Sequence, residues 1–92
     1  INSGQARSLA YSALKKAKEG DIAAARLLMT QSREALNAAH LVQTQLIESD
    51  QGEGKVPVTL VLVHAQDHLM TSMLARELIN ELIDVHEKLL GK

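Results

Sequence analysis

The chain has 92 residues, of which 46% are hydrophobic and one is aromatic. Its formal net charge of −1, from 10 basic and 11 acidic residues, gives no broad attraction for nucleic acid or anionic lipid. The absence of cysteine excludes disulfides and thiolate chemistry. We therefore expect one small domain over residues 1–92, and a chain this short often gains stability by oligomerising.

Helical periodicity begins near the start of the chain. Small and apolar residues recur every three or four positions and predict a first helix from about Asn2 to Glu19. Gly20 suits the C′ position that ends such a helix, and Asp21 suits the N-cap of a second helix that continues to about Glu48. Small and polar residues within the stripe of the second helix indicate close helix approach with some internal hydrogen bonding. Residues 49–55, with two glycines, are predicted to form a loop.

Residues 56–63 are ambiguous, because their valines, leucines and threonine have the composition of a β-strand. We predict a helix, since a lone strand would have no partner in this chain and Pro57 suits the first turn of a helix. The run is too short to span a bilayer. This third helix should end near Leu90, before Gly91. The predicted fold class is all-α, with three helices.

The most informative segment is His64-Ala65-Gln66-Asp67-His68-Leu69-Met70-Thr71, in the predicted third helix. His64, Asp67 and His68 share one side of a helix, because they are separated by three and four positions. Asp67 falls within an apolar stripe that runs from Val63 to Leu89 and that we expect to be buried. A lone buried carboxylate is costly or takes up a proton, so Asp67 needs an explanation.

The residues alone leave open two interpretations of this cluster in which no chemical group is transferred. The three groups would be packed polar residues in a structural or adaptor helical bundle, or part of a zinc site. His64 and His68 have the i, i+4 spacing of helical zinc ligands, although the similar inverted zinc-peptidase motif has Glu where Asp67 stands. A zinc site also needs a distant third ligand, for which His40 and His86 are available without a recognisable motif.

A third interpretation is a histidine that accepts a phosphoryl group. The unperturbed pKa of imidazole is ~6.5, so the neutral, nucleophilic form is available at the pH of the cell. Residues 52–55 lack the spacing of a nucleotide-binding loop and follow no strand. The phosphoryl group would therefore come from another protein.

Three segments carry a resemblance to a known family. They are Asn2-Ser3-Gly4-Gln5-Ala6-Arg7-Ser8, Ala39-His40-Leu41-Val42-Gln43-Thr44 and the segment from His64 to Thr71. In this order they resemble the enzyme IIA components of the lactose/cellobiose class of the bacterial phosphoenolpyruvate-dependent sugar phosphotransferase system, most of all the N,N′-diacetylchitobiose members. The family's domain starts upstream of Ile1, so the first helix is expected to be truncated.

The resemblance implies an antiparallel three-helix subunit that assembles into a homotrimeric helical bundle. It implies that His64 is the phosphohistidine, which accepts a phosphoryl group from HPr and passes it to the cognate IIB component during disaccharide uptake. The sugar would be of the N,N′-diacetylchitobiose, cellobiose or lactose type. It also implies that three copies of Asp67 bind a divalent cation, Mg²⁺, at the trimer axis, which would explain a carboxylate within the stripe.

The expected protein is thus a cytoplasmic phosphotransferase component that contacts neither nucleic acid nor membrane. Gln66 and His68 would either orient the phosphoryl group or serve the structure, and the resemblance does not decide between these roles. We expect His86 on the surface and His40 as a packed polar residue outside the site. The sequence leaves open which disaccharide is imported and whether metal or protons neutralise the Asp67 cluster.

Overall fold

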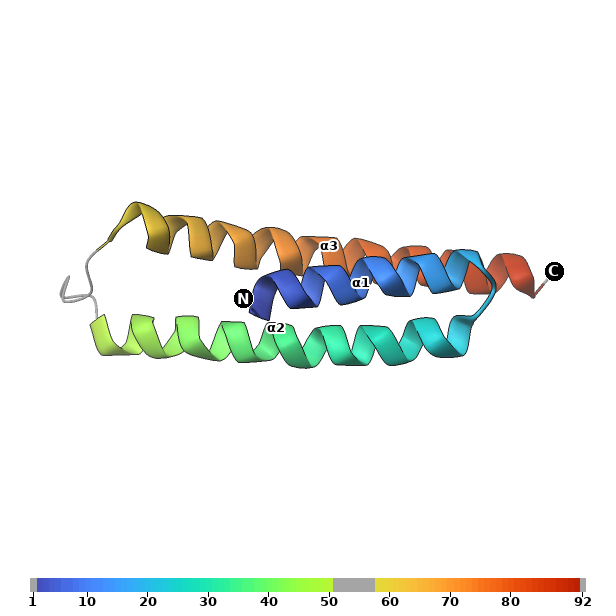
Figure 1. Cartoon of the computed structure of the whole chain (residues 1–92), viewed down its shortest axis with the longest axis horizontal. Coiled ribbons are helices and arrows are strands. Elements are labelled where there is room, and N and C mark those ends of the chain that lie inside the picture. Colours follow the sequence, from blue (N-terminus) through green and yellow to red (C-terminus); the bar gives the residue numbers. More distant parts are fainter. Residues whose placement is uncertain (1, 51–57, 92) are drawn as a thin grey trace.

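The computed structural model describes residues 2–50 and 58–91, and all of its regular structure is helical. The helices are α1 (Asn2–Lys18), α2 (Ile22–Asp50) and α3 (Leu60–Leu90). They form an elongated bundle of 56 × 19 × 18 Å in which α2 runs antiparallel to α1 and α3 (Figure 1). The predicted all-α, three-helix subunit is confirmed within these residues. Figure 1 also shows that α1 begins midway along the bundle, whereas α2 and α3 extend further.

The helix ends follow local signals in the sequence. Gly20 has φ = +89°, a left-handed conformation that glycine adopts at little cost, and it separates α1 from α2. Asp21 caps α2, because its Oδ1 accepts a hydrogen bond from the amide of Ala24 at 3.1 Å. Both ends were predicted, although α2 continues to Asp50, two residues beyond the predicted end. The rest of the predicted loop, residues 51–55, lies outside the described residues.

The ambiguous apolar run forms the start of α3. Thr59 is the N-cap, and its Oγ1 accepts a hydrogen bond from the amide of Leu62 at 3.1 Å. From Leu60 the run is helical, so the helix prediction is confirmed there and the strand alternative is wrong. Pro57, which was predicted to occupy the first turn, lies outside the described residues.

The core between the helices consists largely of small side chains. The buried hydrophobic residues are Ala6, Ala10, Ala13 and Ala17 of α1, Ala25, Met29 and Leu36 of α2, and Leu69, Ile79 and Ile83 of α3. An alanine face on α1 lets its backbone come close to both longer helices, since interaxial distance depends on the side chains at the contact. The buried hydrophobic residues include no aromatic side chain among the described residues, which permits a narrow bundle.

A buried hydroxyl joins all three helices. Ser32 Oγ of α2 donates to the Ala6 carbonyl oxygen of α1 at 2.6 Å and accepts from Arg76 Nε of α3 at 3.0 Å. Arg76 Nη2 also donates to the Met29 carbonyl oxygen at 3.1 Å. Burial, and secondarily the positive charge of Arg33, lower the pKa of Arg76. The internal hydrogen bonding that the polar stripe of α2 predicted is present here.

Two buried serines should respond oppositely to replacement by alanine. Ser72 Oγ has no hydrogen-bond partner among the described residues, so Ser72→Ala should leave the free energy of unfolding unchanged or raise it by up to about 1 kcal/mol. Ser32→Ala should lower it by about 1–3 kcal/mol, because the Ala6 carbonyl and Arg76 both lose a partner. Urea unfolding at equal protein concentration measures both. If Ser72→Ala lowered the free energy of unfolding more than Ser32→Ala does, the assignment of Ser72 Oγ as the hydroxyl without a partner would be contradicted.

The stripe that the sequence placed in the core lies instead on the outside of the single chain. Its apolar members are Val63, Met70, Leu74, Leu78, Val85 and Leu89, each between 50% and 57% exposed. The opposite face of α3, with Leu69, Ser72, Ile79 and Ile83, packs against the other helices. The expectation of burial was wrong for one chain because α3 has two apolar faces, and periodicity does not say which neighbour covers each.

Candidate functional site

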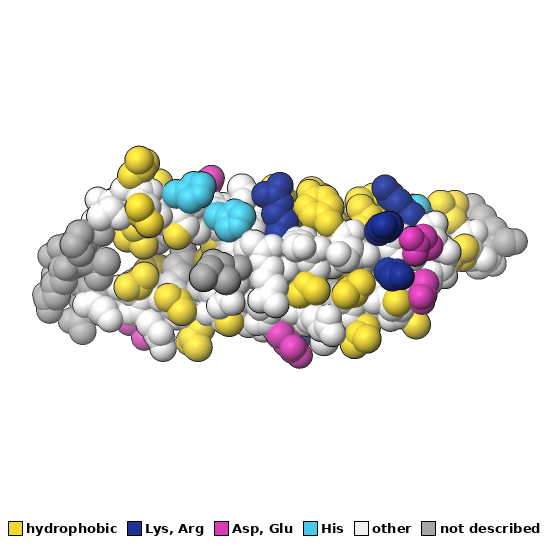
Figure 2. All heavy atoms as spheres, in the orientation of Figure 1, with side chains coloured by type: hydrophobic (Ala, Val, Ile, Leu, Met, Phe, Trp, Pro, Cys, Tyr) yellow, Lys and Arg dark blue, Asp and Glu magenta, His cyan; other side chains and the backbone are white. Residues whose placement is uncertain are grey.

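The first two residues of the site, His64 and His68, lie together on the surface of α3. One turn of helix separates them, and their rings stack with centroids 6.3 Å apart and an interplanar angle of 11°. His64 is exposed and His68 is half-buried. Figure 2 shows the two histidine side chains side by side on an open face of the bundle. An exposed imidazole in this position is accessible to a group on another protein.

Asp67 is also exposed, on the outer stripe of α3 beside His64 and His68 in sequence. Its side chain forms no ion pair with any described residue. Its backbone carbonyl accepts a hydrogen bond from Thr71 Oγ1 at 3.0 Å. In one chain, the carboxylate therefore faces away from the core, among the uncovered apolar residues.

The structure gathers no complete ligand set for zinc. Within residues 2–50 and 58–91, no three His, Asp or Glu side chains are close enough to hold a metal ion. His40 lies on α2 and is exposed, so the expectation of a packed residue was wrong. His86 is half-buried and lies 22 residues further along α3 than His64, about 33 Å at the rise of an α-helix. Neither residue joins His64 and His68.

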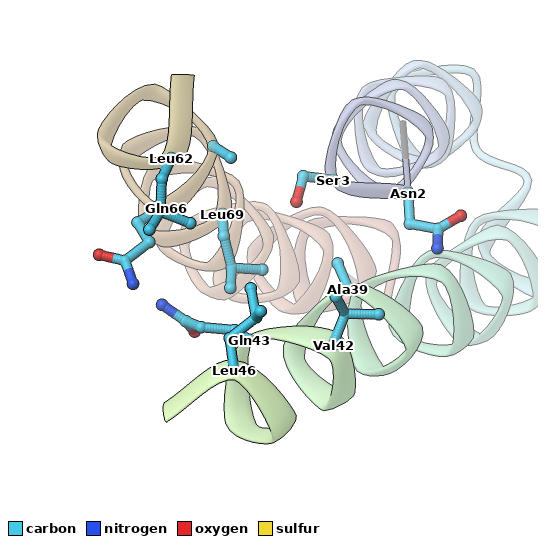
Figure 3. Close-up of a pocket in the computed structure, with 10 residues that line it drawn as sticks. Asn2, Ser3, Ala39, Val42, Gln43, Leu46, Leu62, Gln66 and Leu69 are labelled. Atoms are coloured by element: carbon cyan, nitrogen blue, oxygen red, sulfur yellow. The ribbon is translucent and has the colours of Figure 1, made fainter. Parts of the chain in front are cut away.

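Gln66 lies on the other side of α3. It lines an apolar groove of about 280 Å³ between α2 and α3, together with Leu62 and Leu69 of α3 and Ala39, Val42 and Leu46 of α2. Figure 3 shows Gln66 and Gln43 extending toward each other across this groove. Residues that are two positions apart on an α-helix differ in direction by about 200°. Gln66 and His64 therefore point in nearly opposite directions within one chain.

The sequence argument did not identify a contact between His68 and α1. A Cβ atom added to Gly4 would lie 3.5 Å from Nε2 of His68, so the backbone of α1 passes close to this nitrogen. Gly4 is 64 residues from His68 in sequence. Only the resemblance of the segment from Asn2 to Ser8 pointed to this region, and it assigned no role to Gly4.

No helix within the described residues is long and apolar enough to cross a membrane.

Comparison with known sequences gives a consistent result over nearly the whole chain. Residues 1–87 match the family described as "PTS system, Lactose/Cellobiose specific IIA subunit". The N,N′-diacetylchitobiose-specific EIIA component of Escherichia coli K12 is 79% identical over 89 residues, which are 97% of this chain and 77% of that protein. The lichenan-specific phosphotransferase enzyme IIA component of Bacillus subtilis 168 is 40% identical over 89 residues, covering 97% and 81% of the two chains.

Solved structures share the three-helix arrangement. The Escherichia coli IIA(chitobiose) chain, solved in complex with HPr, matches with a TM-score of 0.85 and 78% identity, over 97% of this chain and 86% of that one. The cellobiose-specific enzyme IIA from Bacillus anthracis matches with a TM-score of 0.94 and 46% identity, over 99% and 84% of the two chains.

Proposed function

Because this chain belongs to the lactose/cellobiose-specific IIA family of the sugar phosphotransferase system, we propose that His64 carries a phosphoryl group from HPr to the cognate IIB component. As a member of this family, the protein is a phosphotransferase component. The observation that carries the proposal is the 79% identity to a chitobiose-specific EIIA, together with the 78% identity to an Escherichia coli IIA(chitobiose) chain that has been solved with HPr. The exposed position of His64 is consistent with that role.

The chemistry requires little beyond an accessible imidazole. The unprotonated nitrogen of His64, Nε2 by analogy with the family, attacks the phosphorus carried by the phosphohistidine of HPr. A P–N bond forms on His64 while the P–N bond of the donor breaks, and the donor imidazole leaves with the electron pair. In the second transfer, a cysteine thiolate of IIB attacks the same phosphorus and His64 leaves. Such transfers depend chiefly on positioning and on stabilising charge.

The outer stripe of α3 supports the proposal of a trimer. Half-exposed apolar side chains follow one face of α3 for its whole length, and a row of this kind on a small domain is typical of an interface between copies. We propose that α3 helices from three copies meet along this stripe. The chain would then bury the apolar surface that its own short core leaves uncovered.

Asp67 would lie close to the three-fold axis of such a trimer. Three converging carboxylates repel each other unless a cation or protons neutralise them. The residue fits a hard divalent cation such as Mg²⁺, because a carboxylate oxygen is its preferred ligand and Asp67 has no competing ion pair among the described residues. One chain supplies a single carboxylate here, so the cation site would be complete only in the trimer.

The identity to the Escherichia coli protein favours N,N′-diacetylchitobiose as the imported sugar. The family assignment, rather than any feature of the fold, is the reason we propose that the protein acts in the cytoplasm.

The test of this function is reconstitution. The protein is incubated with phosphoenolpyruvate, enzyme I and HPr, and its intact mass is recorded. We expect one phosphoryl group per chain, dependent on HPr and removed on addition of the IIB component. A chain that stays unmodified, while an authentic chitobiose-specific EIIA is labelled in parallel, would reject the proposed function.

A further inference from the structure

A second groove lies between α1 and α3, on the side of His68. It has a volume of about 570 Å³, and its lining includes Gly4, Arg7, Ser8 and Lys15 of α1 together with His68. None of the described residues that line it is acidic. His68 connects the groove to His64, because the two rings are stacked. Figure 2 shows a basic side chain next to the histidine pair on this face. The groove therefore presents cations and hydroxyl groups beside His68, whose ring stacks on that of His64.

Gly4 keeps this groove open at His68. The place of its missing side chain lies 3.5 Å from His68 Nε2, so any larger residue would occupy the space in front of that nitrogen. Arg7 follows one turn later on α1, about 4.5 Å further along the helix. Arg7 and His68 line the same groove, so the guanidinium of Arg7 can reach the surroundings of His68.

The side chain of Arg7 contacts an aromatic ring rather than a charged partner among the described residues. No carboxylate among the described residues pairs with it. Its guanidinium instead lies over the ring of Tyr11, with 5.8 Å between Cζ and the ring centroid. A cation–π contact at an exposed site is weak, so a doubly charged phosphoryl group would displace it. The planar guanidinium matches two phosphoryl oxygens at once.

We infer that Arg7, assisted by His68 and the hydroxyl of Ser8, binds the phosphoryl group during its transfer to and from His64. This inference rests on the proposed function. Arg7 leaves Tyr11 and donates two hydrogen bonds to phosphoryl oxygens, where negative charge accumulates in the transition state. It exchanges no proton, and the bonds made and broken remain the P–N bonds of the donor and of His64. The segment from Asn2 to Ser8 would thus form the second half of the site.

The test measures single-turnover transfer from phosphorylated HPr to Arg7→Gln. We expect the maximal rate to fall about 10- to 100-fold, as for the loss of one donor to a developing oxyanion in a partly solvated site. The half-saturating HPr concentration should change little. The ³¹P chemical shift of the phosphohistidine should also differ from that of the unsubstituted protein. The matched control is Lys16→Gln, which removes a cation of α1 that pairs with Glu19 outside the groove and should leave the rate unchanged.

A second variant, Arg7→Lys, tests the inference even if Arg7→Gln does not fold. It keeps the charge and the helix propensity but replaces two parallel hydrogen bonds with a point charge, so an intermediate rate is expected. Wild-type maximal rates in folded Arg7→Gln or in Arg7→Lys would overturn the inference, as would an effect confined to the affinity for HPr. In each of these cases the unsubstituted protein still accepts the phosphoryl group. Absence of transfer to the unsubstituted protein would instead reject the proposed function.

Discussion

His64→Gln should abolish phosphorylation of this protein by HPr while leaving its three helices intact. The glutamine amide has no nucleophilic nitrogen lone pair, so it has nothing with which to accept phosphorus. Because His64 is exposed and outside the core, the substitution removes its stacking on His68 but no core packing. Intact mass after incubation with phosphoenolpyruvate, enzyme I and HPr should show no added phosphoryl group, and circular dichroism should be unchanged.

The matched control for that experiment is His40→Gln. His40 is another exposed histidine and lies on α2, whereas the stacked His64–His68 pair lies on α3. It should be labelled as fully as the unsubstituted chain. Full labelling of His64→Gln would show that the phosphoryl group resides on a different residue.

Asp67→Leu should preserve the proposed trimer and make it more resistant to denaturant. Leucine replaces the carboxylate with an apolar side chain that continues the stripe of α3. Replacing buried charges with well-packed apolar groups is often neutral or stabilising, by about 1–4 kcal/mol. Any dependence of stability on Mg²⁺ should disappear with the carboxylates. Analytical ultracentrifugation and urea unfolding, each with and without a chelator, measure both effects.

Asp84→Leu provides the comparison on the same helix. Asp84 lies off the stripe and accepts a hydrogen bond from Arg26 at 2.8 Å, so its loss should bring no gain in stability. The response to chelator should stay that of the unsubstituted protein. Dissociation of Asp67→Leu into monomers would mean that the carboxylate holds the proposed trimer together rather than being accommodated by it.

Local chemistry explains why the helix boundaries were predictable. The left-handed conformation at Gly20 and the cap by Asp21 each depend on one or two neighbouring residues, so both can be recognised in the sequence. The strand-like run before His64 was harder, since its composition favours β-structure. Helix forms there because Thr59 caps it, and because strands need a partner that this chain lacks among its described residues.

The candidate site was predictable in part, for a similar reason. His64, Asp67 and His68 are neighbours on one helix, and their spacing alone places them on one side of it. The stacked rings of the two histidines agree with that prediction. Arg7 and Gly4 could not be assigned to the site in the same way, because they approach His68 only through the packing of α1 against α3.

The sequence by itself determined the three helices, most of their ends and the family, because capping, periodicity and the segment from His64 to Thr71 are local properties of the chain. The tertiary structure decided which face of α3 packs inside the subunit and which elements border His68. Burial of apolar surface is non-directional, so a helix with two apolar faces can turn either of them toward its neighbours. The alanines of α1 decide between them, since they let α1 and α2 pack closely around Leu69, Ile79 and Ile83 and leave the Val63–Leu89 face outside.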